Sequence, residues 1–292
     1  LTGLSRSNGV TSAYGYDAAG RLTTISHDGS GGNLLFTNYT LDANGNRIGM
    51  ASNAGTESYT LDALNRLTNA TYPNGDTAAY SYDANGNRLS QTFNGVTTNY
   101  SYDDAGQLLS DGTTTYGYDA NGNLTSAGAD SYTWDWANRM TGATVGGASA
   151  SYAYDAFDVR VSGTVSGTSS SYLWDRLAPY PTLVDDGVYG YLHGAGPQAQ
   201  IDGSGNRHYL LSDALASIRG VTDASGALVG SATYDAFGAP RSQTGASSAF
   251  GYTGELYTAA TGLLHLRARD LNPTLGRFLS ADTVQPNAPG SQ

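Results

Sequence analysis

Hydrophobic and polar residues alternate in a short pattern that ends at an aspartate. In YSYDANGNRL (80–89), Tyr80 and Tyr82 flank a serine, and the polar run D-A-N-G follows. Alternate side chains of a β-strand lie on one face, so both tyrosines are predicted to share a face. Asp is favoured at the first position of a type I turn and Gly at the fourth, and D-A-N-G supplies both. The pattern predicts a β-hairpin whose return strand begins at the Arg-Leu pair.

The same pattern recurs along most of the chain. The aspartates of the first nine copies are 16 to 25 residues apart, and a late copy, ATYDAFGAP, occupies residues 232–240. The nine aspartates are Asp17, Asp42, Asp62, Asp83, Asp103, Asp119, Asp135, Asp155 and Asp175. A fixed internal period is the signature of repeated supersecondary units. We therefore expect an all-β fold built from antiparallel β-hairpin repeats.

The residue three positions after each aspartate tests the predicted turn. A type I turn followed by a left-handed residue is a common three-residue hairpin loop. That left-handed position accepts Gly, then Asn or Asp, and few other residues. It is occupied by Gly20, Gly45, Asn65, Gly86, Gly106, Gly122, Asn138, Asp158 and Gly238. Ala178 departs from the rule, in the degenerate copy YLWDRLAPY (172–180).

The repeated aspartates and aromatic residues each have a structural and a binding interpretation. We predict structural turns, with Asp satisfying turn amides and Gly supplying the left-handed conformation. Loops of the EF-hand type place Gly sixth and a bidentate Glu twelfth, whereas Gly is fourth here, so calcium binding is the weaker alternative. Rows of stacked aromatics stabilise a sheet, and sugar binding is the alternative for them. We expect no metal.

Composition supports strands and limits the partners. All 14 basic residues are Arg, and of the 25 acids only Glu57 and Glu255 are not Asp. Exposed helix positions favour Glu and Lys, so this composition argues against a helical protein. The net charge of −11 argues against nucleic acid or an anionic membrane as a partner. There is no Cys, no apolar run of membrane-spanning length and no signal peptide at LTGLSRSNGV, so we expect any targeting signal to lie outside this segment.

Conventional catalytic motifs do not occur in the sequence. The four histidines at positions 27, 193, 208 and 265 do not have the spacing of a metal site. There is no G-x-S-x-G nucleophile elbow, and GGASAS (146–151) lacks the Lys of a phosphate loop. We expect no conventional active site and no cofactor in this segment.

Two C-terminal blocks add a family resemblance. HYLLSDALASIRGVTDASGALV (208–229) and FGYTGELYTAATGLLHLRARDLNPTLGRFLSADT (250–283) resemble the core of the bacterial Rhs family. The repeats resemble the YD repeats of the same family, which it shares with toxin-complex C components and teneurins. Ala214 and Ala216 stand where this family usually has His and Gly. The resemblance implies one continuous sheet that spirals into a hollow shell, closed by a C-terminal core plug, around the protein's own C-terminal toxin.

The resemblance also implies a self-cleavage site of the aspartic-protease type. Arg269 matches the family's arginine and Asp282 its first aspartate, and the second aspartate would fall beyond Gln292. Two carboxylates that share a proton can act as acid and base, so Asp282 alone cannot complete this chemistry. The sequence departs from the family pattern at Leu271-Asn272-Pro273 and at Asp282-Thr283. The structural alternative is that Arg269 and Asp282 only form an ion pair.

These observations predict three regions and one function. Residues 1–185 are the repeat wall, 186–245 are degenerate repeats, and 246–292 are the core, which includes a strand or helix-like segment in 262–271 and a linker in 283–292. We predict an encapsulating shell of a secreted or cell-surface polymorphic toxin used in bacterial competition. Its partners are the protein's own toxin and a delivery domain, both outside this chain. The alternatives are a glycan-binding surface adhesin and a self-assembling extracellular filament.

Overall fold

Strands make up nearly all of the regular secondary structure in the computed structural model, which describes residues 1–178 and 180–282. Within these residues the strands form five antiparallel sheets, and inside each sheet every strand pairs with the next one in sequence. The one helical element among the described residues is the short 3₁₀ turn η1 (Tyr252–Gly254). No helix in the described part of the chain is long and apolar enough to cross a membrane. The all-β, antiparallel prediction is confirmed. The predicted linker at 283–292 lies outside the described residues.

The first two sheets run from residue 3 to residue 110. The strands of the first are β1 (Gly3–Ser5), β2 (Thr11–Tyr16), β3 (Leu22–Gly29), β4 (Gly32–Leu41), β5 (Arg47–Ser52), β6 (Gly55–Leu61), β7 (Leu67–Thr71), β8 (Thr77–Tyr82), β9 (Arg88–Phe93) and β10 (Val96–Asn99). Those of the second are β11 (Ser101–Tyr102) and β12 (Leu108–Ser110).

The next two sheets run from residue 116 to residue 245. The third contains β13 (Tyr116–Tyr118), β14 (Leu124–Ala127), β15 (Asp130–Trp134), β16 (Met140–Val145), β17 (Ala148–Tyr154), β18 (Arg160–Val165) and β19 (Thr168–Ser171). The fourth contains β20 (Leu173–Asp175), β21 (Thr182–Asp185), β22 (Tyr189–Gly194), β23 (Gly196–Asp202), β24 (Arg207–Ser212), β25 (Ile218–Thr222), β26 (Leu228–Tyr234) and β27 (Pro240–Gly245). We call β1–β27 the wall.

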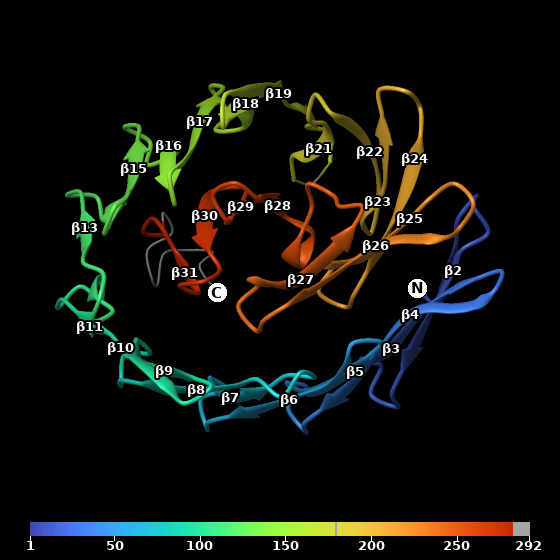
Figure 1. The fold of residues 1–292 in the computed structure, drawn as a ribbon, viewed down its shortest axis with the longest axis horizontal. Coiled ribbons are helices and arrows are strands. Elements are labelled where there is room, and N and C mark those ends of the chain that lie inside the picture. Colours follow the sequence, from blue (N-terminus) through green and yellow to red (C-terminus); the bar gives the residue numbers. More distant parts are fainter. Residues whose placement is uncertain (179, 283–292) are drawn as a thin grey trace.

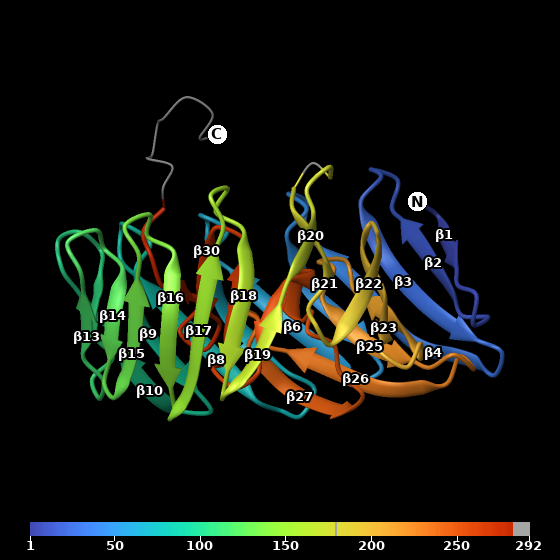
Figure 2. The same ribbon diagram turned by 90° about the horizontal axis from the view of Figure 1, so that it is seen from above.

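The fifth sheet belongs to the C-terminal core, which we define as residues 246–282. Its strands are β28 (Leu256–Thr258), β29 (Leu263–Leu266), β30 (Arg269–Asn272) and β31 (Arg277–Phe278). The segment 262–271, expected to contain a strand or a helix-like segment, forms the β29–β30 hairpin. Figure 1 shows the wall curving around this sheet, which lies on its inner side, and Figure 2 shows the same wall seen at right angles. The division into three regions stays a prediction.

The wall is a succession of sheets, whereas the resemblance implied one continuous sheet. Two of the three breaks in the wall are local, because a single residue interrupts a strand that otherwise continues. Tyr100 separates β10 from β11, and its amide still donates to the Leu89 carbonyl at 2.9 Å. Tyr172 separates β19 from β20, and its amide donates to the Val161 carbonyl at 2.8 Å. At each of these points the strand stops pairing with its predecessor and begins pairing with its successor.

All nine positions expected to be left-handed have positive φ, from 61° at Asn65 and Asn138 to 97° at Gly238. Four more turns have the same form but were not predicted from the sequence. Their left-handed residues are Gly75, Gly205, Ala216 and Gly226, with φ between 66° and 86°. Tyr72 replaces Asp in the first of these turns. The others begin at Asp202, Asp213 and Asp223, of which Asp213 and Asp223 had been assigned only to the family block.

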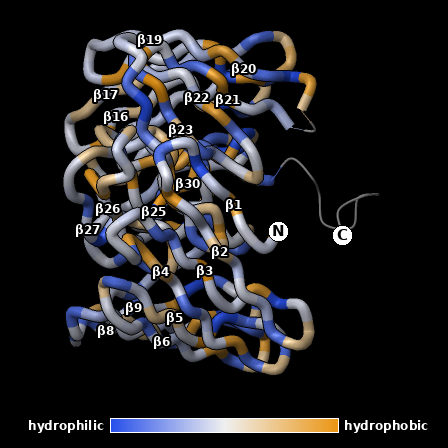
Figure 3. Tube along the Cα trace, turned by 90° about the vertical axis from the view of Figure 1, so that its right-hand side faces the viewer, coloured by the Kyte–Doolittle hydropathy of each residue, from blue (hydrophilic) through white to orange (hydrophobic). Residues whose placement is uncertain are grey.

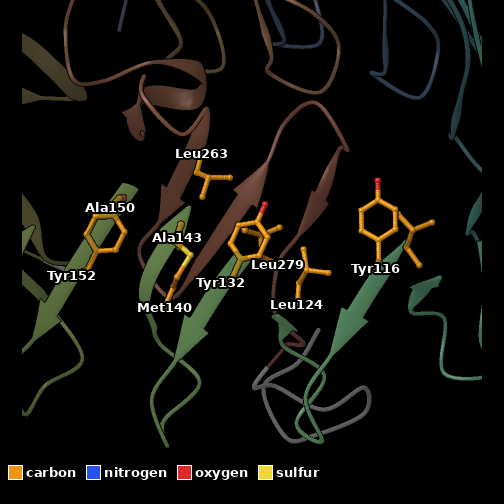
Figure 4. Close-up of a cluster of buried hydrophobic side chains, with 10 residues drawn as sticks. Tyr116, Leu124, Tyr132, Met140, Ala143, Ala150, Tyr152, Leu263 and Leu279 are labelled. Carbon is orange, nitrogen blue, oxygen red and sulfur yellow. The ribbon is translucent and has the colours of Figure 1, made fainter. Parts of the chain in front are cut away.

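The wall packs against the core through an apolar cluster. Figure 4 shows Tyr116, Leu124, Tyr132 and Met140 of the wall close to core residues that include Leu263. Main-chain pairing adds to this contact, because the Leu124 amide donates to the Leu279 carbonyl at 2.8 Å. We call this contact between β13–β18 and the core the core joint.

The first and last strands of the wall also meet, at a contact that we call the seam. It joins β1–β8 to β23–β27, and Figure 1 shows β3 and β4 beside β25 and β26. Asn8 Nδ2 donates to the Asp223 carbonyl at 2.8 Å, and the Ala214 amide donates to Tyr39 Oη at 3.0 Å. A cavity of about 310 Å³ lies between the two sets of strands. In Figure 3 short hydrophobic stretches alternate with hydrophilic ones along the tube.

Candidate functional site

Each turn that begins at an aspartate is held by that side chain, as the first repeat shows. Asp17 Oδ1 accepts the amides of Ala19 and Arg21, both at 2.9 Å, and Oδ2 accepts Arg21 Nε at 2.6 Å. The Gly20 amide donates to the Asp17 carbonyl at 2.9 Å. These donors, led by the Arg21 amide, keep the pKa of Asp17 below its ordinary value. In this geometry the carboxylate oxygens are taken up by turn donors, and the described residues contain no cluster of three or more acidic, His or Cys side chains that could hold a metal.

An arginine four residues after the aspartate joins neighbouring turns. Arg21 Nη1 donates to the Asp42 carbonyl at 2.8 Å. Arg66 and Arg139 make the equivalent bonds to the carbonyls of Asp83 and Asp155, at 2.9 and 3.1 Å. The contact links each of these turns to the next aspartate turn along the same edge of the wall.

A second link comes from the aromatic residue immediately before the aspartate. Its polar hydrogen donates to the carbonyl five residues after an earlier turn aspartate, which is Asp213 for Tyr234 and the aspartate of the preceding predicted repeat in the other cases. The bonds are Tyr82 to Leu67 (2.7 Å), Tyr102 to Arg88 (2.8 Å), Trp134 to Leu124 (2.7 Å), Tyr154 to Met140 (2.9 Å), Trp174 to Arg160 (2.6 Å) and Tyr234 to Ile218 (2.9 Å). Sequence reasoning missed this link. The available signal was that aromatic residues at this position are Tyr or Trp, which carry a donor, and never Phe.

The tyrosine three residues before the aspartate points into the packed side of the wall. Tyr39, Tyr59, Tyr80, Tyr116, Tyr132 and Tyr152 are all buried. These rings contribute to the apolar clusters and do not form an open row on the surface. Their arrangement supports the structural interpretation of the aromatic repeat.

Some repeats have one extra residue between the aspartate and the arginine, and in these repeats the arginine occupies a different position on the return strand. Arg47, Arg88 and Arg160 lie five residues after the aspartate, and a shift of one residue along a strand reverses the face. Arg88 is buried, and its Nη2 donates to the Leu275 carbonyl of the core at 2.6 Å. The residue four after the aspartate in the Arg88 repeat is Asn87, whose Nδ2 bonds Asp83 Oδ2 at 2.9 Å. In the Arg88 repeat, therefore, Asn87 binds the turn aspartate and the arginine side chain faces the core.

Arg160 forms the most buried ion pair of the described residues. Its Nη2 lies 3.0 and 3.1 Å from the two carboxylate oxygens of Asp270, and its guanidinium carbon is 3.6 Å from the centre of the Tyr152 ring. Both charged side chains are at most 4 % exposed. His265 Nδ1 lies 3.2 Å from Asp270 Oδ1. Burial favours the neutral acid, yet Arg160 and His265 hold the pKa of Asp270 below its ordinary value. Burial, with Arg160 nearby, lowers the pKa of His265.

The two residues predicted to take part in self-cleavage lie together at the surface. Arg269 Nη2 is 2.9 Å from Asp282 Oδ2, and their side chains are 25 % and 50 % exposed. The Arg269 guanidinium also stacks on Phe278, 3.8 Å from the ring centre. This geometry is an ion pair beside the core sheet, and the catalytic role of Arg269 and Asp282 stays a prediction. Sequence reasoning did not find the neighbouring Arg160–Asp270 pair.

Comparisons with known proteins identify the family of this chain. The teneurin YD-shell family model matches residues 44–171 and 190–288, and the RHS repeat model matches residues 1–32. A comparison with curated proteins gives no match.

Solved structures of toxin complexes share the fold. The Photorhabdus luminescens Tc holotoxin pore has a TM-score of 0.80 at 18 % identity over 98 % of this chain. A TcdB2–TccC3 crystal structure has a TM-score of 0.78 at 17 % identity over 96 % of the chain. This chain spans only 17 % and 18 % of those two chains. The family-model match covers more than half of the sequence, and the chain therefore belongs to the teneurin YD-shell family.

Proposed function

We propose that this chain is the wall and core section of a closed shell that encloses the C-terminal toxin of its own longer protein. The observation that carries this proposal is the position of the core on the inner side of the wall (Figure 1), where the buried Arg160–Asp270 pair fixes it. A polypeptide that follows the core would start beside the inner surface. The likeness to toxin-complex structures supports the shell as its context. The shell would be secreted or exposed at the cell surface and act in bacterial competition.

Protease protection tests enclosure in the longer natural protein. We expect the segment after the core to resist proteinase K while the shell is intact. Asp270→Asn, which breaks the buried pair, should expose that segment at protease concentrations the parent survives. Arg176→Gln changes an exposed ion pair with Asp155 and serves as the matched control. Rapid digestion of the segment inside an intact wall would contradict enclosure.

Self-cleavage is a separate part of the proposal. In the longer protein, Arg269 and Asp282 would act with a second aspartate further along the chain. Mass spectrometry of the purified protein should show two fragments, and Asp282→Asn should leave the chain uncut. Asp104→Asn, an exposed aspartate outside the predicted site, should cleave normally. An unchanged fragment pair in Asp282→Asn removes this residue from the mechanism.

A glycan-binding adhesin is the second candidate, because two aromatic rings are exposed on neighbouring turns. Trp136 and Phe157 are 89 % and 78 % exposed. A glycan array on the purified chain should show binding that Trp136→Ala abolishes if this function is correct. An array without signal rejects it.

A further inference from the structure

Arg47, Arg88 and Arg160, which lie five residues after the aspartates of three predicted repeats, have different partners. Arg88 and Arg160 both bind the core, through the Leu275 carbonyl and the Asp270 carboxylate. Arg47 occupies the equivalent position in its repeat. Within residues 1–178 and 180–282 its side chain makes no hydrogen bond or ion pair, and its guanidinium lies beside two aromatic rings. An arginine at a position that binds the core elsewhere is therefore without an anionic partner here.

Arg47 stands between two tyrosines. Its guanidinium carbon is 5.2 Å from the centre of the Tyr59 ring and 5.8 Å from that of Tyr39. Cation–π contacts of this kind stabilise a guanidinium group and leave its edge free for a planar acceptor. Because both tyrosines are buried, the position of Arg47 is well defined by packing.

Arg47 lines an open cavity of about 550 Å³. Much of the lining is aliphatic, from Leu22, Leu41, Leu61, Leu67 and Leu215, and no carboxylate contributes to it. Arg21 also lines the cavity, but its side chain is bound to Asp17 and to the Asp42 carbonyl. Arg47 is thus the unneutralised charge of a largely apolar site.

We propose that this cavity binds the carboxylate of an acidic peptide whose neighbouring side chains are apolar. The planar guanidinium would take the carboxylate through two parallel hydrogen bonds, and the leucines would contact the flanking side chains. Because the chain as a whole carries a net charge of −11 and repels anions, we expect an acidic peptide to bind at this unneutralised arginine and not elsewhere on the protein. In the longer protein the natural occupant is an acidic segment of the enclosed toxin. This last step rests on the proposed function, whereas peptide binding does not.

Peptide binding is tested on the 292-residue chain. The probe is acetyl-Leu-Glu-Leu-amide, titrated while the arginine Nε–Hε signals are followed by NMR, with acetyl-Leu-Gln-Leu-amide as the uncharged comparison. The Nε–Hε signal of Arg47 is identified as the one that is absent from the spectrum of Arg47→Gln. We expect the glutamate peptide to shift this signal. Because hydrogen bonds to charged groups are strong, Arg47→Gln should weaken binding about tenfold or more. Arg207→Gln removes the same charge from an exposed position on β24 and should bind like the parent.

Three results would overturn the peptide site: equal binding of both peptides, undiminished binding by folded Arg47→Gln, or no binding. Hexanoate tests whether a free carboxylate with an apolar chain is enough for binding. If the site recognises a peptide, the glutamate peptide must bind more tightly than hexanoate. Circular dichroism confirms that each variant is folded.

The role in cargo binding is tested separately in the longer protein. Arg47→Gln should increase hydrogen exchange in one acidic part of the enclosed segment while the segment stays protected from protease. Unchanged exchange, with peptide binding intact in the isolated chain, overturns the cargo role alone. Loss of protease protection in the parent protein instead overturns the proposed function.

Discussion

The core joint and the seam join parts of the chain that are distant in sequence, but they are built differently. The core joint contains a cluster of ten buried apolar residues and the buried Arg160–Asp270 pair. The seam has a smaller cluster of five buried residues between Tyr59 and Tyr80, on which Phe237 packs, together with dispersed hydrogen bonds and a cavity of about 310 Å³. Close-packed contacts stabilise more than contacts around a cavity, since lining atoms of a cavity lose their neighbours. We therefore expect the strands at the seam to separate before the core joint opens when the protein is destabilised.

The largest expected effect is at the core joint. Asp270→Asn leaves Arg160 buried without a countercharge, and breaking a buried pair in this way costs about 3–5 kcal/mol. Urea unfolding should show this loss of unfolding free energy. Arg176→Gln removes an exposed pair and should change stability by about 1 kcal/mol or less. Similar losses in the two variants would show that the core joint is no stronger than a surface contact.

Acid should weaken the seam. His27 lies between Ser12 Oγ at 2.7 Å and the Ser212 carbonyl at 3.1 Å, with Arg6, Asp28 and Asp213 as the nearest charged groups. Burial lowers the pKa of His27 from 6.5 to about 4. The unfolded chain therefore binds more protons between these values. Stability is retained above pH 6.5 and falls as pH drops toward 4, by up to about 3 kcal/mol.

Urea midpoints measured from pH 7.5 to 4 check the acid effect. His27→Gln should be less stable at neutral pH and should show a shallower decline over this range. An equally steep decline in the variant would assign the acid sensitivity to other groups. His265 of the core joint also has a lowered pKa and contributes in the same direction.

The smallest expected effect is a gain in stability at the seam. Ala216 has a φ of 66°, a conformation that a residue with a Cβ adopts at a cost. Ala216→Gly should raise the unfolding free energy by about 0.5–1 kcal/mol. Ala214→Gly, in the same turn but without positive φ, should not be stabilising. Thermal unfolding of both variants makes the comparison, and a loss in Ala216→Gly would show that packing of the methyl group outweighs the strain.

Local structure was predictable because its causes are local. The positive φ of Gly20, Asn65 and the equivalent residues follows from turn chemistry within four residues. The core joint was not predictable, since Arg160 and Asp270 are 110 residues apart and no periodic pattern relates them. The inward direction of Arg88 depends on a single inserted residue, whose effect on the strand face could not be decided from the sequence. The seam depends on how far the whole wall curves.

The hydrogen bond from each aromatic residue to the carbonyl of the preceding repeat has an evolutionary consequence. Because successive repeats use the same contact, a duplicated hairpin already carries both halves of the joint that it needs. Unequal recombination within the gene could lengthen the wall by whole hairpins without new contact residues. The perimeter of the wall would grow in proportion to repeat number and the cross-section inside it with the square. A few duplications would then suffice to fit a larger cargo.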